Sequence, residues 1–272
     1  MIDPADLMLT RFLFWMYSGV VAVGFLRTTL GRRGFGYAYF LYKRYWEDEL
    51  AALIAVHPEL FRGGDVLDVG ANIGYTASLF EGAVDPGCVV HAFEPEPRNF
   101  ESLSWLAGKS KVAGRILPVH AAVGREPGVI FLSLNDLHPG DHRVLTSTFQ
   151  NNSQGESRLE VPIVSLDRYV AGLRPVPRVA FVKIDVQGYE LAVCQGMEQL
   201  IAGNPEITIV LEYMPQAMKD LGFVAGDLLD WLHSRGFYIY QLGKKGTLLM
   251  VTDEVMLGLR GYEDILCRKV PI

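Results

Sequence analysis

A glycine-rich turn that follows an apolar run is the first feature of the sequence suited to ligand binding. Asp68 lies in the apolar run, and Gly70, Asn72 and Gly74 follow it. Glycine allows the backbone to approach a bound molecule without obstruction by a side chain. The spacing differs from the G-x-G-x-x-G fingerprint, whose tighter turn holds the pyrophosphate of a dinucleotide. The turn therefore favours a nucleoside ligand that carries no pyrophosphate.

A carboxylate follows at the spacing expected of a ribose-binding residue. Glu94 ends the next apolar run, about twenty residues after the glycine turn. Pro95 comes directly after it and fits the end of a strand, because proline cannot continue a ladder of hydrogen bonds. A carboxylate in this place can accept hydrogen bonds from both hydroxyls of a ribose. The turn and the carboxylate together predict a nucleoside site in a β-α-β unit.

A polar loop offers side chains for acid–base chemistry. Asp141, His142 and Arg143 lie in a stretch rich in Asn, Asp, Ser, Gly and Gln. The ordinary pKa of histidine is about 6.5, so His142 could accept a proton at neutral pH. Asp141 could orient that ring, and Arg143 could hold an anionic or sugar substrate. The alternative is a capped surface loop without a role in chemistry.

Two further acidic residues end apolar runs in the second half of the chain. Asp185 and Glu212 are expected to meet at the sheet edge where ligands bind. Lys183 points to the same face as Asp185, so it could pair with that carboxylate or contact substrate. The two carboxylates could share a proton, so that one acts as a base, or bind a divalent cation. No third metal ligand is clearly placed, so we expect no metal site. Alternatively, these polar residues only cap a helix and a sheet edge and have no role in chemistry.

Apolar runs and amphipathic stretches alternate through most of the chain. Half of the residues are hydrophobic and 21% are charged, which provides for a large core. Strands are expected at 65–69, 88–93, 116–123, 129–134, 157–164, 179–186, 207–213, 238–242 and 265–269, and helices at 75–81, 97–107, 189–202 and 226–235. This alternation is typical of a mostly parallel sheet with helices on both faces. The sequence thus predicts one α/β domain over residues 47–272.

Residues 1–46 differ in composition and are expected to form an apolar and basic helical extension. Phe12–Leu26 carries no charge, but a helix of that length extends about 22 Å, short of the ~30 Å hydrocarbon core of a bilayer. Residues 1–45 hold six basic and two acidic side chains. Such a segment could lie on an anionic membrane surface. Alternatively it packs on the core or on a second subunit, which would make the protein a homo-oligomer.

Charge and cysteine content narrow the class of protein further. The net charge of −6 argues against a nucleic-acid partner, because proteins that bind nucleic acids present a basic face. Cys88, Cys194 and Cys267 are widely spaced and odd in number, so they indicate neither a disulfide framework nor a zinc cluster. We expect three buried thiols in a cytoplasmic protein, with peripheral attachment to the inner face of a membrane left open.

Four sequence blocks together resemble the FkbM family of methyltransferases. In chain order they are DVGANIGYTA, FEPEPRNF, VSLDRYV and VKIDVQGYE, within residues 65–213. The resemblance implies a Rossmann-like class I methyltransferase fold with a seven-stranded sheet. It also implies S-adenosylmethionine as the methyl donor and a hydroxyl oxygen as the usual acceptor. Carried over by position, Asp68, Gly70, Asn72 and Gly74 would line the methionine and ribose side, and Glu94 would hold the ribose.

The sequence therefore predicts an S-adenosylmethionine-dependent O-methyltransferase that acts on a small molecule, a saccharide or a glycolipid. Asp141, His142, Asp185 and Glu212 are the candidate catalytic residues, and the sequence does not choose the base among them. A nicotinamide-dependent oxidoreductase is an alternative that the missing G-x-G-x-x-G fingerprint argues against. A membrane-docked binding or scaffold protein without catalysis is the alternative from another class, and residues 1–45 motivate it.

Overall fold

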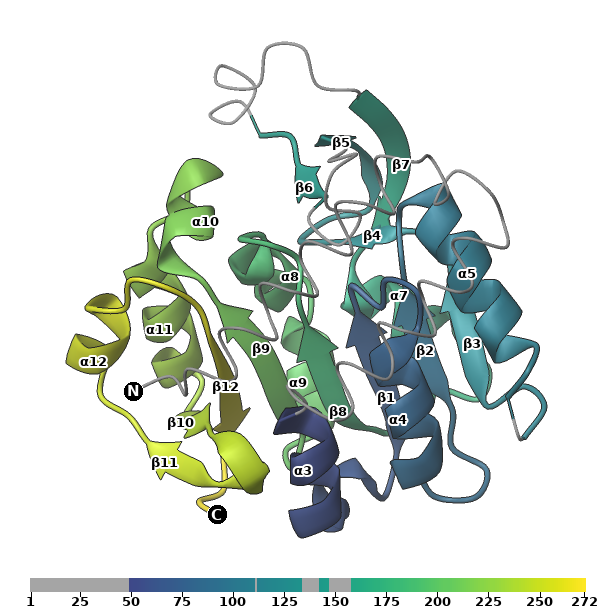
Figure 1. Cartoon of the computed structure of the whole chain (residues 1–272), viewed down its shortest axis with the longest axis horizontal. Coiled ribbons are helices and arrows are strands. Elements are labelled where there is room, and N and C mark those ends of the chain that lie inside the picture. The colour runs from purple at the N-terminus through teal and green to yellow at the C-terminus, as the bar shows by residue number, and fades with distance from the viewer. Residues whose placement is uncertain (1–48, 111, 134–141, 147–157) are drawn as a thin grey trace, which may run out of the picture. The chain divides into compact units, whose positions relative to one another are not determined.

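Short apolar runs form the strands of an eight-stranded main sheet (Figure 1). The computed structural model of the chain describes residues 49–110, 112–133, 142–146 and 158–272. From one edge to the other, the strands are β11 (Leu248–Met250), β10 (Tyr238–Leu242), β12 (Glu263–Arg268), β9 (Thr208–Tyr213), β8 (Val179–Ile184), β1 (Asp65–Val69), β2 (Val90–Phe93) and β3 (Ile116–Val119). The glycine turn leaves β1 near the middle of this sheet.

The main sheet is parallel on one side and antiparallel on the other. All pairings from β9 through β8, β1 and β2 to β3 are parallel. The pairings β9–β12, β12–β10 and β10–β11 are antiparallel. The predicted Rossmann-like α/β fold is confirmed, with eight strands in place of the seven expected. The additional strand is β11, whose three residues are too few to give a strand pattern in sequence.

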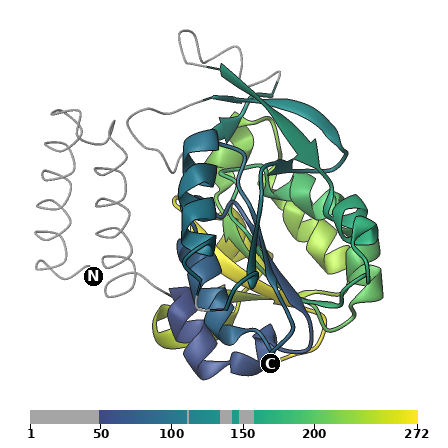
Figure 2. The same cartoon turned by 90° about the vertical axis from the view of Figure 1, so that its right-hand side faces the viewer.

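Helices cover both faces of the main sheet, as predicted (Figure 2). One face packs against α3 (Glu49–Val56), η3 (Pro58–Phe61), α4 (Tyr75–Ala83) and α5 (Pro97–Ala107). The other packs against α7 (Leu166–Gly172), α8 (Glu190–Gln195), α9 (Glu198–Gly203) and α11 (Ala225–Ser234). The remaining helical segments are α10 (Pro215–Asp220), η4 (Lys244–Gly246) and α12 (Asp253–Leu257).

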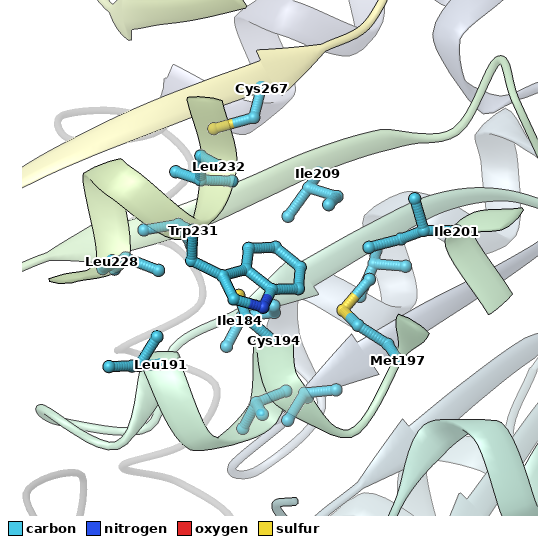
Figure 3. Packing of buried hydrophobic residues seen from close by; sticks show 14 of the residues in the cluster. Ile184, Leu191, Cys194, Met197, Ile201, Ile209, Leu228, Trp231, Leu232 and Cys267 are labelled. Carbon is cyan, nitrogen blue, oxygen red and sulfur yellow. The ribbon is translucent and has the colours of Figure 1, made fainter. Parts of the chain in front are cut away.

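Trp231 lies within the core on the second of these faces (Figure 3). Around it are Ile184 of β8, Cys194 of α8 and Cys267 of β12, so this cluster ties helices to the sheet. Cys194 and Cys267 are buried, as predicted. Cys88 is only half-buried, because β2 begins at Val90 and leaves Cys88 in the preceding turn.

A second, four-stranded sheet lies beyond the carboxyl ends of β8 and β1 (Figure 1). Its strands, in spatial order, are β4 (Ala122–Val123), β7 (Arg158–Val164), β5 (Gly128–Ser133) and β6 (Arg143–Val144). The single strand expected at 116–123 is therefore two strands in different sheets. The helix expected at 189–202 is also two, α8 and α9, which are separated at Gly196; a Cβ atom there would lie 2.1 Å from the carbonyl oxygen of Gly124. This contact brings the chain after β4 against the break between α8 and α9.

The predicted N-terminal extension, residues 1–46, lies outside the described residues, so the boundary at residue 47 stays a prediction. Among the helices that the structure does describe, none combines the length and the hydropathy needed to cross a bilayer.

Candidate functional site

A cleft opens where the carboxyl ends of β1, β2 and β8 face the second sheet. It encloses about 680 Å³ of space, including its open mouth. Its lining comprises Val69, Gly70, Asn72, Phe93, Glu94, Pro95, Asn99, Ala121, Ala122, Val123, Leu132, His142, Val144, Asp185, Val186, Gln187 and Tyr189. The cleft therefore brings together the glycine turn, Glu94, His142 and Asp185, which are far apart in the sequence.

The glycine turn after β1 has a backbone that few other residues could adopt. Gly70 and Gly74 have φ angles of 77° and 92°, and Asn72 has a φ of 51°. A Cβ atom at Gly70 would lie 1.9 Å from the carbonyl oxygen of Asp185, so the chain leaving β1 runs directly against the chain leaving β8. Gly74 does not line the cleft; a Cβ there would lie 2.6 Å from Leu106 of α5. Gly70 thus shapes the cleft, and Gly74 allows α4 and α5 to pack closely.

Glu94 presents its carboxylate to the cleft from the end of β2. Its Oε2 accepts a hydrogen bond from the backbone N–H of Asn72, and its Oε1 accepts one from the N–H of Glu96, both at 2.9 Å. Burial raises the pKa of Glu94 to about 7, although these two N–H groups oppose the shift. Each carboxylate oxygen has a second lone pair. Glu94 can therefore accept two hydroxyl groups of a ligand while it anchors the glycine turn.

Asp68 is fully buried behind the glycine turn and does not line the cleft. Thr76 of α4 donates a hydrogen bond to its Oδ2 at 2.6 Å, and the Nζ of Lys183 lies 3.5 Å from its Oδ1. Burial raises the pKa of Asp68, and the Lys183 charge opposes that shift. Asp68 therefore supports the glycine turn from behind. The sequence predicted that it lines the ligand site itself.

The ammonium group of Lys183 joins the ends of β1 and β8. It donates a hydrogen bond to the carbonyl oxygen of Gly70 at 3.0 Å and lies 3.4 Å from Oδ2 of Asp185. The pairing with Asp185 follows from their positions on one face of β8, as the sequence indicated. Burial lowers the pKa of Lys183, but the charges of Asp185 and Asp68 outweigh it and raise the pKa. Lys183 therefore stays charged beneath the cleft, and only 8% of its side chain is exposed.

Gln187 bridges the two carboxylates that end β8 and β9. Its Nε2 donates to Oδ1 of Asp185 and to Oε2 of Glu212, each at 3.0 Å. Its φ of 55° is left-handed, which is rare for a residue other than glycine and is typical of functional turns. Burial, followed by the charge of Asp185, raises the pKa of Glu212 to about 9. Glu212 is thus protonated at neutral pH, and Asp185 is the member of the pair that reaches the cleft.

Glu190 holds the turn that contains Gln187. Its Oε1 accepts hydrogen bonds from the N–H groups of Val186 and Gly188, at 3.2 and 3.1 Å. Burial raises the pKa of Glu190 to about 7 in spite of these bonds. Gly188 has a φ of 104°, and a Cβ there would lie 2.6 Å from the backbone of Ala217. Glu190 begins α8, and an acidic residue at a helix start gives no sequence signal of buried bonds to a neighbouring turn.

The loop predicted to supply a base is only partly described. His142 lines the cleft, whereas Asp141 lies outside the described residues. The Nη1 of Arg143 lies 3.4 Å from Oδ2 of Asp220 at the end of α10. Thr146 donates a hydrogen bond to the carbonyl oxygen of Leu221 at 2.9 Å. Residues 142–146 therefore attach the second sheet to α10 and place His142 at the cleft.

Several residues of the cleft carried no signal in the sequence. Leu132 and Val144 face it from the second sheet, and a single apolar residue in a strand gives no indication of a ligand. Tyr189 lines the cleft, and its ring packs edge-to-face on Phe223 with centroids 5.7 Å apart. In the described part of the chain, no group of three or more His, Cys, Asp or Glu side chains is arranged to hold a metal ion.

The chain is similar to known methyltransferases. The sequence profile of the methyltransferase FkbM domain matches residues 68–239, more than half of the chain. The chain is 31% identical over 229 residues to the 31-O-demethyl-FK506 methyltransferase FkbM of Streptomyces tacrolimicus, a match that covers 75% of this chain and 83% of that protein. It is 32% identical over 136 residues to the hexuronic acid methyltransferase AglP of Haloferax volcanii, which covers 49% and 50%.

Among solved structures, the methyltransferase FkbM from Methylobacillus flagellatus aligns with a TM-score of 0.45 and 16% identity, over 75% of this chain and 43% of that one. The strand order of the main sheet, β11-β10-β12-β9-β8-β1-β2-β3, establishes the fold of this chain.

The pKa of Glu212 leads to a prediction for stability. The folded protein keeps a proton on Glu212 that the unfolded chain releases above its ordinary pKa of 4.5, so this contribution to stability is lost as the pH rises toward about 9. Glu212→Gln carries no proton to lose. At pH 8 we expect it to raise the free energy of unfolding by about 1–3 kcal/mol relative to wild type, and by less at pH 5.

Denaturant unfolding across this pH range checks the prediction, and Glu206→Gln, an exposed residue, is the control. Parallel pH profiles for Glu212→Gln and wild type would show that the Glu212 carboxyl does not hold the proton.

Proposed function

The chain belongs to the FkbM family of methyltransferases, and we propose that it transfers a methyl group from S-adenosylmethionine to a hydroxyl oxygen of a small molecule or saccharide. The observation that carries the proposal is a shared cleft: Gly70, Glu94 and Asp185 face the same space from three adjacent strands. The name of one relative, 31-O-demethyl-FK506 methyltransferase, supports oxygen as the acceptor atom.

The residues at the β1 and β2 side of the cleft fit a nucleoside. The second lone pairs of the Glu94 oxygens suit a pair of ribose hydroxyls. Gly70 and Asn72 present backbone along the same wall, where a larger residue at Gly70 would collide with Asp185. S-adenosylmethionine, when bound, supplies a methyl group already activated by its sulfonium. The chain therefore has to align a nucleophile and accept a proton.

Asp185 is the residue we propose to orient the acceptor hydroxyl. Lys183 and Gln187 fix its carboxylate from two sides, at 3.4 and 3.0 Å. A carboxylate held in this way can accept the hydrogen bond of the hydroxyl, direct a lone pair of the oxygen toward the methyl group, and take the proton as the new C–O bond forms. The raised pKa of Glu212 supports Asp185 over Glu212 as the base at neutral pH. His142 also lines the cleft and is the second candidate for the proton.

A membrane-docked role is a separate candidate, supported by sequence alone. The observation that favours it is the apolar and basic composition of residues 1–45. It is compatible with methyl transfer, because a lipid-linked acceptor would be presented at the membrane surface.

The cofactor assignment predicts a selective effect at Glu94. At pH 8 or above, where Glu94 with its pKa of about 7 is mostly ionised, Glu94→Gln removes the charged acceptor. It should weaken binding of S-adenosylmethionine about 10- to 100-fold, because a hydrogen bond to a charged group contributes about 1.5–3 kcal/mol. Glu96→Gln is the matched control: Glu96 is also buried, but it caps α5 through the N–H of Asn99 and does not line the cleft. Calorimetric titration of both variants checks this. Equal affinities of the two variants for S-adenosylmethionine would show that Glu94 does not contact the cofactor.

The role of Asp185 predicts a loss of turnover. Asp185→Asn should lower the rate of methyl transfer at saturating cofactor by roughly 10²–10⁴-fold near neutral pH, as expected for loss of a positioned proton acceptor. Asp253→Asn, which removes an exposed carboxylate paired with His233 away from the cleft, should change the rate by less than about threefold. A larger loss in His142→Gln than in Asp185→Asn would assign the base to the histidine.

Membrane contact has its own test. Deletion of residues 1–30 should lower co-sedimentation with anionic vesicles, because it removes the apolar run and two of its flanking arginines, Arg11 and Arg27. The affinity for S-adenosylmethionine should stay the same. Unaltered sedimentation would instead point to packing within the protein or between subunits.

A further inference from the structure

Part of the cleft lining combines apolar side chains with one carboxylate, that of Asp185. We call this part the acceptor half and define it by Val123, Leu132, Val144, Asp185, Val186 and Tyr189. The Asp185 side chain is 37% exposed there, and four of the other five are aliphatic. An apolar wall cannot solvate a charged ligand, so the charge that such a ligand carries has to be matched by a side chain.

Lys183 and Arg143, the basic residues that the sequence suggested as substrate ligands, are already engaged. The ammonium of Lys183 contacts the carbonyl oxygen of Gly70 and the carboxylates of Asp68 and Asp185, and its side chain is 8% exposed. Arg143 pairs with Asp220, on the side of α10. Among the described residues that line the cleft, none is Lys or Arg.

An anionic acceptor would therefore meet the carboxylate of Asp185 with no lysine or arginine among the described residues that line the cleft; His142 is the histidine in that lining. Juxtaposed like charges cost binding free energy, most of all where water is partly excluded.

We propose, on the basis of the proposed function, that the acceptor is an uncharged hydroxyl compound with an apolar face, and that carboxylate-bearing acceptors such as uronic acids are rejected. A ring with one apolar face packs on Val123, Leu132 and Val144. Its hydroxyl group donates a hydrogen bond to Asp185, which accepts it without a net change of charge. Lys183 and Arg143, which the sequence suggested as substrate ligands, take structural roles in this arrangement.

Matched probe pairs test the proposal. Each pair has one neutral and one anionic member on the same ring: 4-nitrophenyl glucoside with 4-nitrophenyl glucuronide, and 4-(hydroxymethyl)cyclohexanol with 4-hydroxycyclohexanecarboxylate. Affinities are measured by calorimetry on the full chain saturated with S-adenosylhomocysteine, and methyl transfer by mass shift with S-adenosylmethionine. We expect the neutral member of each pair to bind at least about tenfold more tightly near neutral pH. Equal or tighter binding of an anionic member, or no binding of either neutral member, would overturn the proposal.

A charge placed in the apolar wall gives an independent readout. Val144→Lys should raise the affinity of the anionic probes about tenfold or more relative to Val144→Met, a variant of similar length without charge. If Val144→Lys does not fold, Val186→Lys and Val186→Met serve in its place, since Val186 is only half-buried. The same anion affinity in the Lys and Met variants would show that this wall does not contact the acceptor.

Separate results would contradict cofactor binding and the preference for an uncharged acceptor. A folded wild-type chain that does not bind S-adenosylhomocysteine would defeat the proposed function. A chain that binds it, and then prefers the anionic probes, would defeat only the inference about the acceptor.

Discussion

A single ammonium group, that of Lys183, holds the ends of β1 and β8 together beneath the cleft. It binds the carbonyl oxygen of Gly70 and lies within 3.5 Å of the carboxylates of Asp68 and Asp185. Removal of one partner from such a buried set costs about 3–5 kcal/mol, because it leaves the remaining charge uncompensated. The position of Asp185 at the cleft and the course of the glycine turn both depend on this group.

The remaining contacts at the site extend this framework. Gln187 links Asp185 to Glu212, and Glu190 holds the turn in which Gln187 lies. On the other side, Glu94 fixes the turn through the N–H of Asn72. Buried hydrogen bonds thus hold the polar side of the cleft, at the ends of β1, β2 and β8. The opposite side is formed by apolar side chains of the second sheet. A polar side held in this way favours alignment of the reacting groups, and the apolar side is where acceptors would be distinguished.

The sequence predicted the parts of the fold and site that depend on local pattern. The strand Tyr238–Leu242 and the helix Pro97–Ala107 were placed with their observed bounds, because apolar periodicity and a proline at the helix start mark them. The division of 116–123 between two sheets depends on which strands pair at a distance, and no local pattern encodes that. The same is true of Asp68 and Lys183, whose residue types suggested ligand contacts but whose burial follows from packing behind Gly70. Asp141 and residues 1–46 lie outside the described residues, so their roles remain predictions.

Binding of the cofactor to the wild-type chain is the measurement that most directly tests the central claim, that the cleft between the glycine turn, Glu94 and Asp185 is a methyl-donor site. Calorimetric titration with S-adenosylmethionine, and separately with S-adenosylhomocysteine, should show one binding event per chain for each. A folded protein that gives no binding of either compound would contradict the claim.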